Sequence, residues 1–150
     1  MKGPVKIVPP LYLLVCLIIM TLLHWLLPVS QLLESAWRFG AVVVLLAGLL
    51  TIIFAARLFH RLETPIRPFE QPQLLVTQGL FAYSRNPMYL GMVIFLIGYA
   101  VILGSLTPWL VIPVFVWLIQ ERFIKVEETG LEQAYGDTYR HYQQRVRRWL

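Results

Sequence analysis

Four long apolar runs divide the chain, and short polar segments separate them. The first three contain 17 to 19 residues, close to the about 20 that a helix needs to cross the hydrocarbon core of a bilayer. The last run begins at Thr107 and Pro108, which read as an N-cap followed by a proline in the first helical turn. The pattern predicts membrane spans over about residues 11–27, 39–57, 88–106 and 108–121.

The composition supports a membrane protein. Hydrophobic residues make up 58% of the 150 residues and charged residues 14%, whereas soluble domains carry about 25% charged residues. A soluble fold of this length could not hide so much apolar surface. We therefore expect one all-α domain, an integral membrane helical bundle of four transmembrane helices with a cytoplasmic amphipathic helix at its C-terminus. The single cysteine, Cys16, excludes an internal disulfide.

The basic residues predict the orientation of the bundle. They gather before the first span, between the second and third spans, and after the fourth, whereas the link between the third and fourth spans has none. Lys and Arg are enriched in cytoplasmic loops, so we expect a multi-pass protein with both termini in the cytoplasm, in a bacterial inner membrane. The net charge of +5 then reflects contact with the lipid bilayer, and no nucleic acid partner is expected.

The residues after the fourth span predict a further helix. Glu121 and Lys125 form a favourable pair four residues apart, and Gly130 is expected to break the helix that contains them. Beyond it, apolar and aromatic residues recur at helical spacing and predict an amphipathic helix on the cytoplasmic side. The residues that form this face are Leu131, Tyr135, Tyr139, Tyr142, Val146 and Trp149.

Two polar segments could carry chemistry. Asn86 and Pro87 read as the N-cap and first residue of the third helix, and a helix N-terminus beside Arg85 favours an anionic group. The alternative is a capped helix whose arginine lies at the lipid headgroups. Glu127 and Glu128 lie just past the fourth span, where acids are expected to pair or to bind a ligand. The alternative there is a solvated helix end with ion pairs to Arg122 or Lys125.

Several site classes are excluded by the sequence. His24 lies inside the first span, where a histidine is a functional candidate, but its place beside Trp25 favours the outer interface. The three histidines and one cysteine lie far apart, so no metal site is expected. There is no Walker loop and no G-x-G-x-x-G segment, which excludes a Rossmann-type cofactor domain.

Both polar segments together resemble a known family. The segment L-V-T-Q-G-L-F-A-Y-S-R-N-P-M-Y-L-G, residues 75–91, resembles the motif of the isoprenylcysteine carboxyl methyltransferase and phospholipid methyltransferase superfamily of membrane enzymes. The tail resembles its second motif, E-E-x-x-L, then G-x-x-Y-x-x-Y, then V-x-R, over residues 127–148. The resemblance covers the C-terminal half of the chain, and the first two spans match only as generic helices.

The resemblance implies S-adenosyl-L-methionine as the methyl donor, held at the cytoplasmic face. By the charges of that cofactor, Glu127 suits its ammonium or ribose, and Arg85 suits its carboxylate. One tail tyrosine, Tyr139, is a further candidate contact, although its helical spacing also fits packing alone. The cofactor-binding residues that the motif implies are Gln73, Leu74, Leu75, Val76, Phe81, Asn86, Pro87, Met88, Tyr89 and Glu127.

The chain departs from the family pattern at three positions. Gln73 stands where histidine is frequent, and Phe81 stands where tyrosine is frequent. The isoprenylcysteine enzymes place a substrate-binding arginine four residues before the cofactor glutamate, but here that residue is Phe123, with Arg122 beside it as the candidate substrate-binding residue. The resemblance therefore does not extend to an acceptor with a prenylcysteine carboxylate.

The predicted function is methyl transfer to a lipophilic or small apolar acceptor through sulfur, oxygen or nitrogen. The nucleophile stays open, because only an amine would need a base, for which Glu128 and His141 are candidates. One alternative is a non-catalytic membrane scaffold or assembly protein that keeps the same helical hairpin. A small transporter would need paired charges at mid-membrane, and spans two to four have none.

Overall fold

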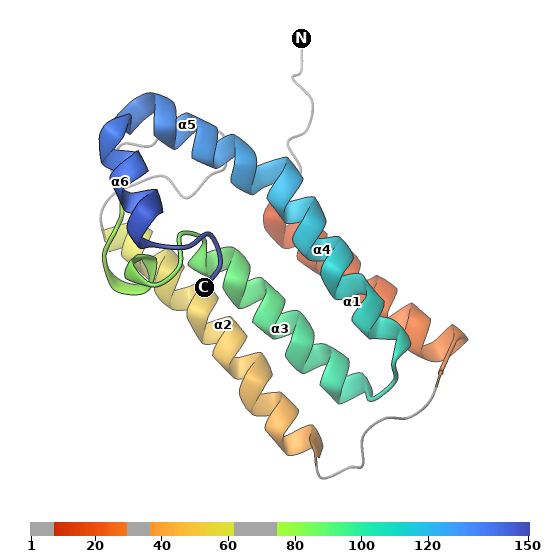
Figure 1. Cartoon of the computed structure of the whole chain (residues 1–150). Coiled ribbons are helices and arrows are strands. Elements are labelled where there is room, and N and C mark those ends of the chain that lie inside the picture. The colour runs from red at the N-terminus through yellow and green to blue at the C-terminus, as the bar shows by residue number, and fades with distance from the viewer. Residues whose placement is uncertain (1–7, 30–36, 62–74) are drawn as a thin grey trace.

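The computed structural model describes residues 8–29, 37–61 and 75–150, which fold into helices without a β-strand (Figure 1). The helices are α1 (Pro9–Leu26), α2 (Trp37–Arg61), α3 (Pro87–Leu103), α4 (Val111–Ile119), α5 (Lys125–Tyr135) and α6 (Asp137–Arg145). Shorter helical turns connect some of them: the 3-10 helices η1 (Gly79–Ala82) and η2 (Thr107–Leu110), and the π-helix η3 (Gln120–Ile124). The predicted all-α class is confirmed for these residues.

Each predicted span is helical, although the bounds differ by a few residues. Two helices, Pro9–Leu26 and Phe39–Arg61 within α2, are long and apolar enough to cross a membrane, and α3 is apolar but shorter. Their outward faces are rich in large apolar side chains such as Leu22 and Phe54, which are 52% and 54% exposed. Those faces suit lipid, and four membrane crossings stay a prediction.

A main core joins α1, α3, α4 and η3. Met20, Leu96, Phe115, Ile119 and Ile124 are each fully buried there. Helix α3 also lies directly against α2, because Gly48, Gly91 and Gly98 leave no side chain between the two backbones. A Cβ on Gly98 would come within 2.5 Å of the Leu45 backbone nitrogen. Small residues permit this close approach in membrane helices.

The turn between α3 and α4 reverses the chain (Figure 1). Gly104 ends α3 with a φ of 76°, a left-handed conformation that glycine adopts without steric cost. The predicted N-cap role of Thr107 is wrong, since its hydroxyl makes no cap and instead donates to Leu27 O at 2.9 Å. His24 Nδ1 lies 2.8 Å from the buried Ser105 Oγ. These bonds tie the end of α1 to the turn.

Helix α4 continues through η3 into α5 without a break (Figure 1). The predicted pair forms, with Lys125 Nζ 2.6 Å from Glu121 Oε1. The predicted break at Gly130 is wrong, because this residue lies inside α5 and the helix ends only at Tyr135. Gly136 makes the break with a φ of 50°. The break falls there because a left-handed backbone is needed to turn α6 back, and glycine supplies it.

The predicted amphipathic tail helix is only partly correct. Tyr139, Tyr142 and Val146 are buried together and pack against Leu131 and Tyr135, so the apolar face is confirmed. The turn at Gly136 divides this face between α5 and α6, and the chain becomes extended at Val146. The last residues then run back toward the start of α3 (Figure 1).

Candidate functional site

The two motif segments meet at one end of the bundle. Figure 1 shows η1, the start of α3, the end of α2 and helix α6 gathered there. The site therefore combines residues far apart in the sequence, which is what the paired motifs predict. Gln73 and Leu74 lie outside the described residues, and their predicted cofactor contacts stay predictions.

The η1 turn is anchored from two sides. Val76 and Phe81 are buried against Ala55 of α2, and the rings of Phe59 and Phe81 meet edge to face with centroids 5.1 Å apart. On the other side, the Tyr142 hydroxyl donates to Phe81 O at 2.6 Å. Of the remaining predicted residues, Met88 packs against the Phe81 cluster and Leu75 against the Tyr142 cluster.

The start of α3 differs from the prediction at one residue. Pro87 occupies the first turn as predicted, and Asn86 is the N-cap residue. The Asn86 side chain makes no cap, however, and its Nδ2 instead donates to Arg148 O at 2.9 Å. The backbone N of Arg85 donates to Arg147 O at 3.0 Å. The Asn86 side chain and the Arg85 backbone are thus bonded to the segment that follows α6.

Glu128 is held by two arginines. Arg148 donates two hydrogen bonds to the Glu128 carboxylate, from Nη2 to Oε2 at 2.6 Å and from Nε to Oε1 at 3.1 Å. Arg85 Nη1 lies 3.2 Å from Glu128 Oε1. The carboxylate is only 11% exposed, so its role is that of a buried ionic partner, which disfavours the predicted candidacy as a general base. The alternative of ion pairs to Arg122 or Lys125 is wrong for Glu128.

Arg85 has hydrogen-bond donors that no acceptor of the described residues uses. Its side chain is 11% exposed, and its Nε and Nη1 are buried with no hydrogen-bond acceptor among the described residues. A buried donor without an acceptor is costly unless a ligand supplies one. With two arginines to one carboxylate, this part of the site carries a surplus positive charge. Both features favour an anionic ligand group.

Glu127 faces a different environment. Its Oε1 accepts a hydrogen bond from the Tyr89 hydroxyl at 2.7 Å, and no cation of the described residues lies within ion-pair distance. Burial raises the pKa of Glu127 from its ordinary value of 4.5 to about 7, although the Tyr89 bond opposes the rise. The side chain is therefore a half-buried acid that has no positive partner among the described residues.

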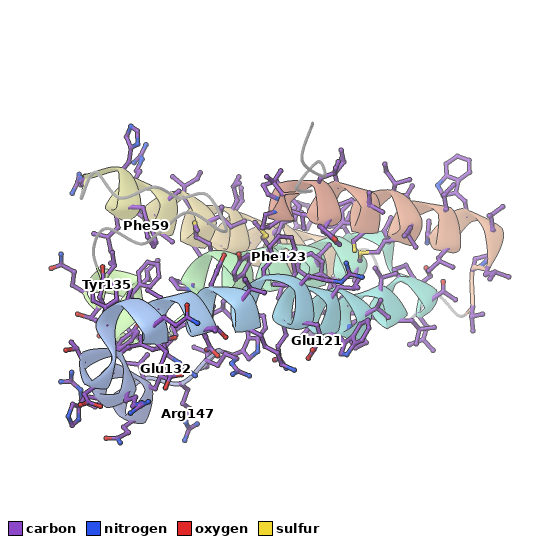
Figure 2. All side chains as sticks on the ribbon, turned by 90° about the horizontal axis from the view of Figure 1, so that it is seen from above. Phe59, Glu121, Phe123, Glu132, Tyr135 and Arg147 are labelled. Atoms are coloured by element: carbon purple, nitrogen blue, oxygen red, sulfur yellow. The ribbon has the colours of Figure 1, made fainter. Side chains whose placement is uncertain are left out.

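The aromatic residues around this acid close the site on the bundle side. Phe123 of η3 is 2% exposed, and its ring lies 6.4 Å from that of Tyr89 and 5.3 Å from that of Tyr12. Figure 2 shows Phe123 between the helices, whereas Glu121 and Glu132 point outward. The π-helical turn that places Phe123 is a geometry frequent at functional sites.

The structure separates the remaining candidates. Tyr139 is 1% exposed and lies near Glu128 and Arg85, so it lies at the site. His141 is exposed on α6 and Arg122 is exposed on η3, so neither is among the buried groups of the site. Sequence reasoning missed the structural role of Arg148, whose only signal was its place in the V-x-R motif.

Comparisons with known proteins identify the family of this chain. Residues 36–138 match the family described as phospholipid methyltransferase. The chain is 34% identical over 112 residues to protein-S-isoprenylcysteine O-methyltransferase B of Arabidopsis thaliana, which covers 73% of this chain and 56% of that protein. It is 36% identical over 73 residues to a protein-S-isoprenylcysteine O-methyltransferase of Schizosaccharomyces pombe, which covers 49% and 31%.

A third relative is shorter. An uncharacterized protein of Haemophilus influenzae is 43% identical over 63 residues, which covers 42% of this chain and all of that protein. No solved structure matches the chain. Because the family match extends over residues 36–138 of the 150, the chain belongs to the phospholipid methyltransferase family, in the superfamily that includes the isoprenylcysteine carboxyl methyltransferases.

Proposed function

We propose that this protein is a membrane methyltransferase that uses S-adenosyl-L-methionine. It transfers a methyl group to a lipophilic or small apolar acceptor, through sulfur, oxygen or nitrogen, at the cytoplasmic face. The observation that carries the proposal is an acid without a cation and an arginine with unused hydrogen-bond donors in one site. Glu127 is a half-buried acid without a cation among the described residues, and Arg85 pairs with Glu128 but has buried Nε and Nη1 atoms without a hydrogen-bond acceptor there.

These charges fit the amino acid end of the cofactor, which has an ammonium and a carboxylate. Two contacts hold Arg85 and Glu127 in one site. Arg85 pairs with Glu128 at 3.2 Å. Tyr89, which lies one helical turn after Arg85, donates a hydrogen bond at 2.7 Å to Glu127, the neighbour of Glu128 in the sequence. Arg85 Nε and Nη1 would donate to the carboxylate, and Glu127 would accept from the ammonium or the ribose.

When bound, S-adenosylmethionine supplies an electrophilic methyl group on a sulfonium cation. The protein has to orient the acceptor and exclude water, because in-line displacement depends on alignment. Tyr139 and Tyr142 of α6 and Phe123 of η3 are buried, and they would limit the access of water to the bound cofactor. A thiolate or carboxylate acceptor requires no base from the protein.

The acceptor is proposed to lack a prenylcysteine carboxylate. The relatives named protein-S-isoprenylcysteine O-methyltransferase are similar to this chain over part of their length. At the position where the resemblance implies their substrate arginine, this chain has Phe123, which is buried between Tyr12 and Tyr89. An aromatic side chain there favours a neutral, apolar acceptor over an anionic one.

The test is calorimetric binding of S-adenosylmethionine to the detergent-solubilised protein. The wild type should bind, and Glu127→Ala should lose about 1.5–3 kcal/mol of binding free energy, the contribution of a hydrogen bond to a charged group. Glu132→Gln is the matched control, since Glu132 lies on the same helix with its side chain 44% exposed. Equal affinity for wild type and Glu127→Ala would refute the assignment of Glu127.

A further inference from the structure

The last residues form a strap over the start of α3. We define the C-terminal strap as residues 146–149. It follows α6 and begins with Val146 in an extended conformation, and its backbone accepts bonds from Arg85 N and Asn86 Nδ2. At its end the Trp149 indole donates to Gln120 Oε1 at 3.4 Å. The strap thus joins η3, α5 and the start of α3.

Arg148 is the charged residue of the strap that faces inward. Its guanidinium makes both bonds to Glu128, a bidentate geometry that is stronger and more directional than a single contact. Arg85 reaches the same carboxylate only through Nη1, at 3.2 Å and without hydrogen-bond geometry. Arg148 therefore holds the stronger position in the competition for Glu128.

We propose that Arg148 is a positioning residue: by occupying Glu128, it keeps the donors of Arg85 free for the carboxylate of the cofactor. This inference rests on the proposed function, in which Arg85 binds that carboxylate. Arg148 itself needs no contact with the ligand. Its effect is transmitted through Glu128, which is buried between the two arginines.

The charge balance explains why the strap is needed. With both arginines present, the Glu128 carboxylate pairs with Arg85 and with Arg148. One negative charge then faces two positive charges, and the excess positive charge remains on the buried Arg85. Without Arg148, Glu128 and Arg85 would be left as an isolated buried pair. A guanidinium 3.2 Å from an otherwise unpaired carboxylate can rotate to form a two-point bond with it. That pairing would use the donors which the ligand requires.

Ligand binding separates this role from simple packing. Arg148→Gln should weaken S-adenosylmethionine binding about tenfold or more, the loss expected for a charged hydrogen bond. The double variant Glu128→Gln/Arg148→Gln should regain most of the affinity, because a neutral amide at position 128 no longer captures Arg85. Arg147→Gln is the matched control, since that side chain is exposed at the outer edge of the molecule (Figure 2), and it should bind as the wild type does.

A ligand-free measurement separates failure of this inference from failure of the proposed function. In protein labelled with ¹⁵N at arginine, the Nε–H signal of Arg85, assigned through Arg85→Lys, should shift and exchange more slowly in Arg148→Gln. It should return toward its wild-type position in the double variant. If the wild type binds no S-adenosylmethionine, the proposed function fails, and the NMR signal still decides whether Glu128 captures Arg85.

Two outcomes would overturn the positioning role. One is a double variant that binds as weakly as Arg148→Gln, which indicates that the strap acts by packing alone. The other is an Arg85 signal that does not respond to the loss of Arg148. Thermal unfolding is measured alongside, and Arg148→Lys serves if Arg148→Gln does not fold. Lysine keeps the charge but not the two-point bond, so its affinity should lie below that of the wild type.

Discussion

Replacing Glu127 with Gln should stabilise the protein and weaken cofactor binding in the same variant. The carboxylate is half-buried, it has one hydrogen bond from Tyr89, and desolvation raises its pKa to about 7. Gln keeps the size and can still accept the Tyr89 bond, but it carries no charge to desolvate. The same ionisation that costs stability is the one that would attract the cofactor's ammonium.

The expected stability change follows from the pKa. The folded protein holds the Glu127 proton more tightly than the unfolded chain, so stability falls as pH rises from 4.5 through 7. At 1.36 kcal/mol per pKa unit, the shift from 4.5 to about 7 corresponds to a loss of about 3 kcal/mol at most above pH 7. Glu127→Gln lacks this loss, so its advantage over the wild type should grow across that pH range.

Binding should have the opposite pH dependence. With a pKa of about 7, about 9% of Glu127 is ionised at pH 6 and about 76% at pH 7.5. Wild-type affinity should therefore rise roughly eightfold over this interval, reduced to about sixfold as the ligand's own amino group, with a pKa near 8, begins to lose its proton. Glu127→Gln should show no such rise.

Thermal unfolding between pH 5 and 8 and calorimetry at pH 6 and 7.5 check both expectations. Glu132→Gln should follow the wild type in each assay, because the Glu132 side chain is 44% exposed and its ion pair with Arg140 lies at the surface. A Glu127→Gln variant that unfolds with the same pH dependence as the wild type and binds S-adenosylmethionine equally well would refute both.

Three further predictions concern the fold. Gly98→Ala should destabilise the protein by about 1–3 kcal/mol, because the added Cβ would clash with the α2 backbone. Gly130→Ala should be neutral or stabilising by up to about 1 kcal/mol, because the space around this residue is open. Thermal unfolding of both variants measures these changes. Tyr142→Phe should cost about 1–3 kcal/mol in the same assay, since the buried Phe81 carbonyl loses its donor. A reporter fused after Leu150 should be found in the cytoplasm; an external reporter would mean a different number of crossings.

The helices were predictable from the sequence because apolar runs of this length have few other structures available. The ends of the helices were less predictable. Gly130 and Gly136 both look like breaks, and only the packing of α6 against α5 decides that Gly136 makes the turn. Thr107 looks like a helix cap, but its hydroxyl donates a hydrogen bond to a carbonyl at the end of α1. In each case a tertiary contact replaced the local preference.

The two motifs predict residues that the structure brings to one end of the bundle, among them Phe81, Asn86, Tyr89 and Glu127, and their binding of a cofactor stays a prediction. The contacts that these residues make with one another were not predictable from the sequence. Asn86 was expected to cap α3, and Glu128 was a candidate base, but both are engaged by Arg148, a residue 20 or more positions away. A sequence shows that such residues exist but not which cation reaches which acid. The raised pKa of Glu127 also depends on burial, which no local pattern shows.

Transfer of a labelled methyl group tests the central claim most directly. Purified protein is incubated with methyl-labelled S-adenosylmethionine and a membrane lipid extract, and the organic and aqueous fractions are separated. Label is expected in the lipophilic fraction with wild-type protein and Glu132→Gln, and it should be strongly reduced with Glu127→Gln and Arg85→Gln. Protein that binds the cofactor yet labels no acceptor would contradict the claim, as would transfer that survives both substitutions unchanged.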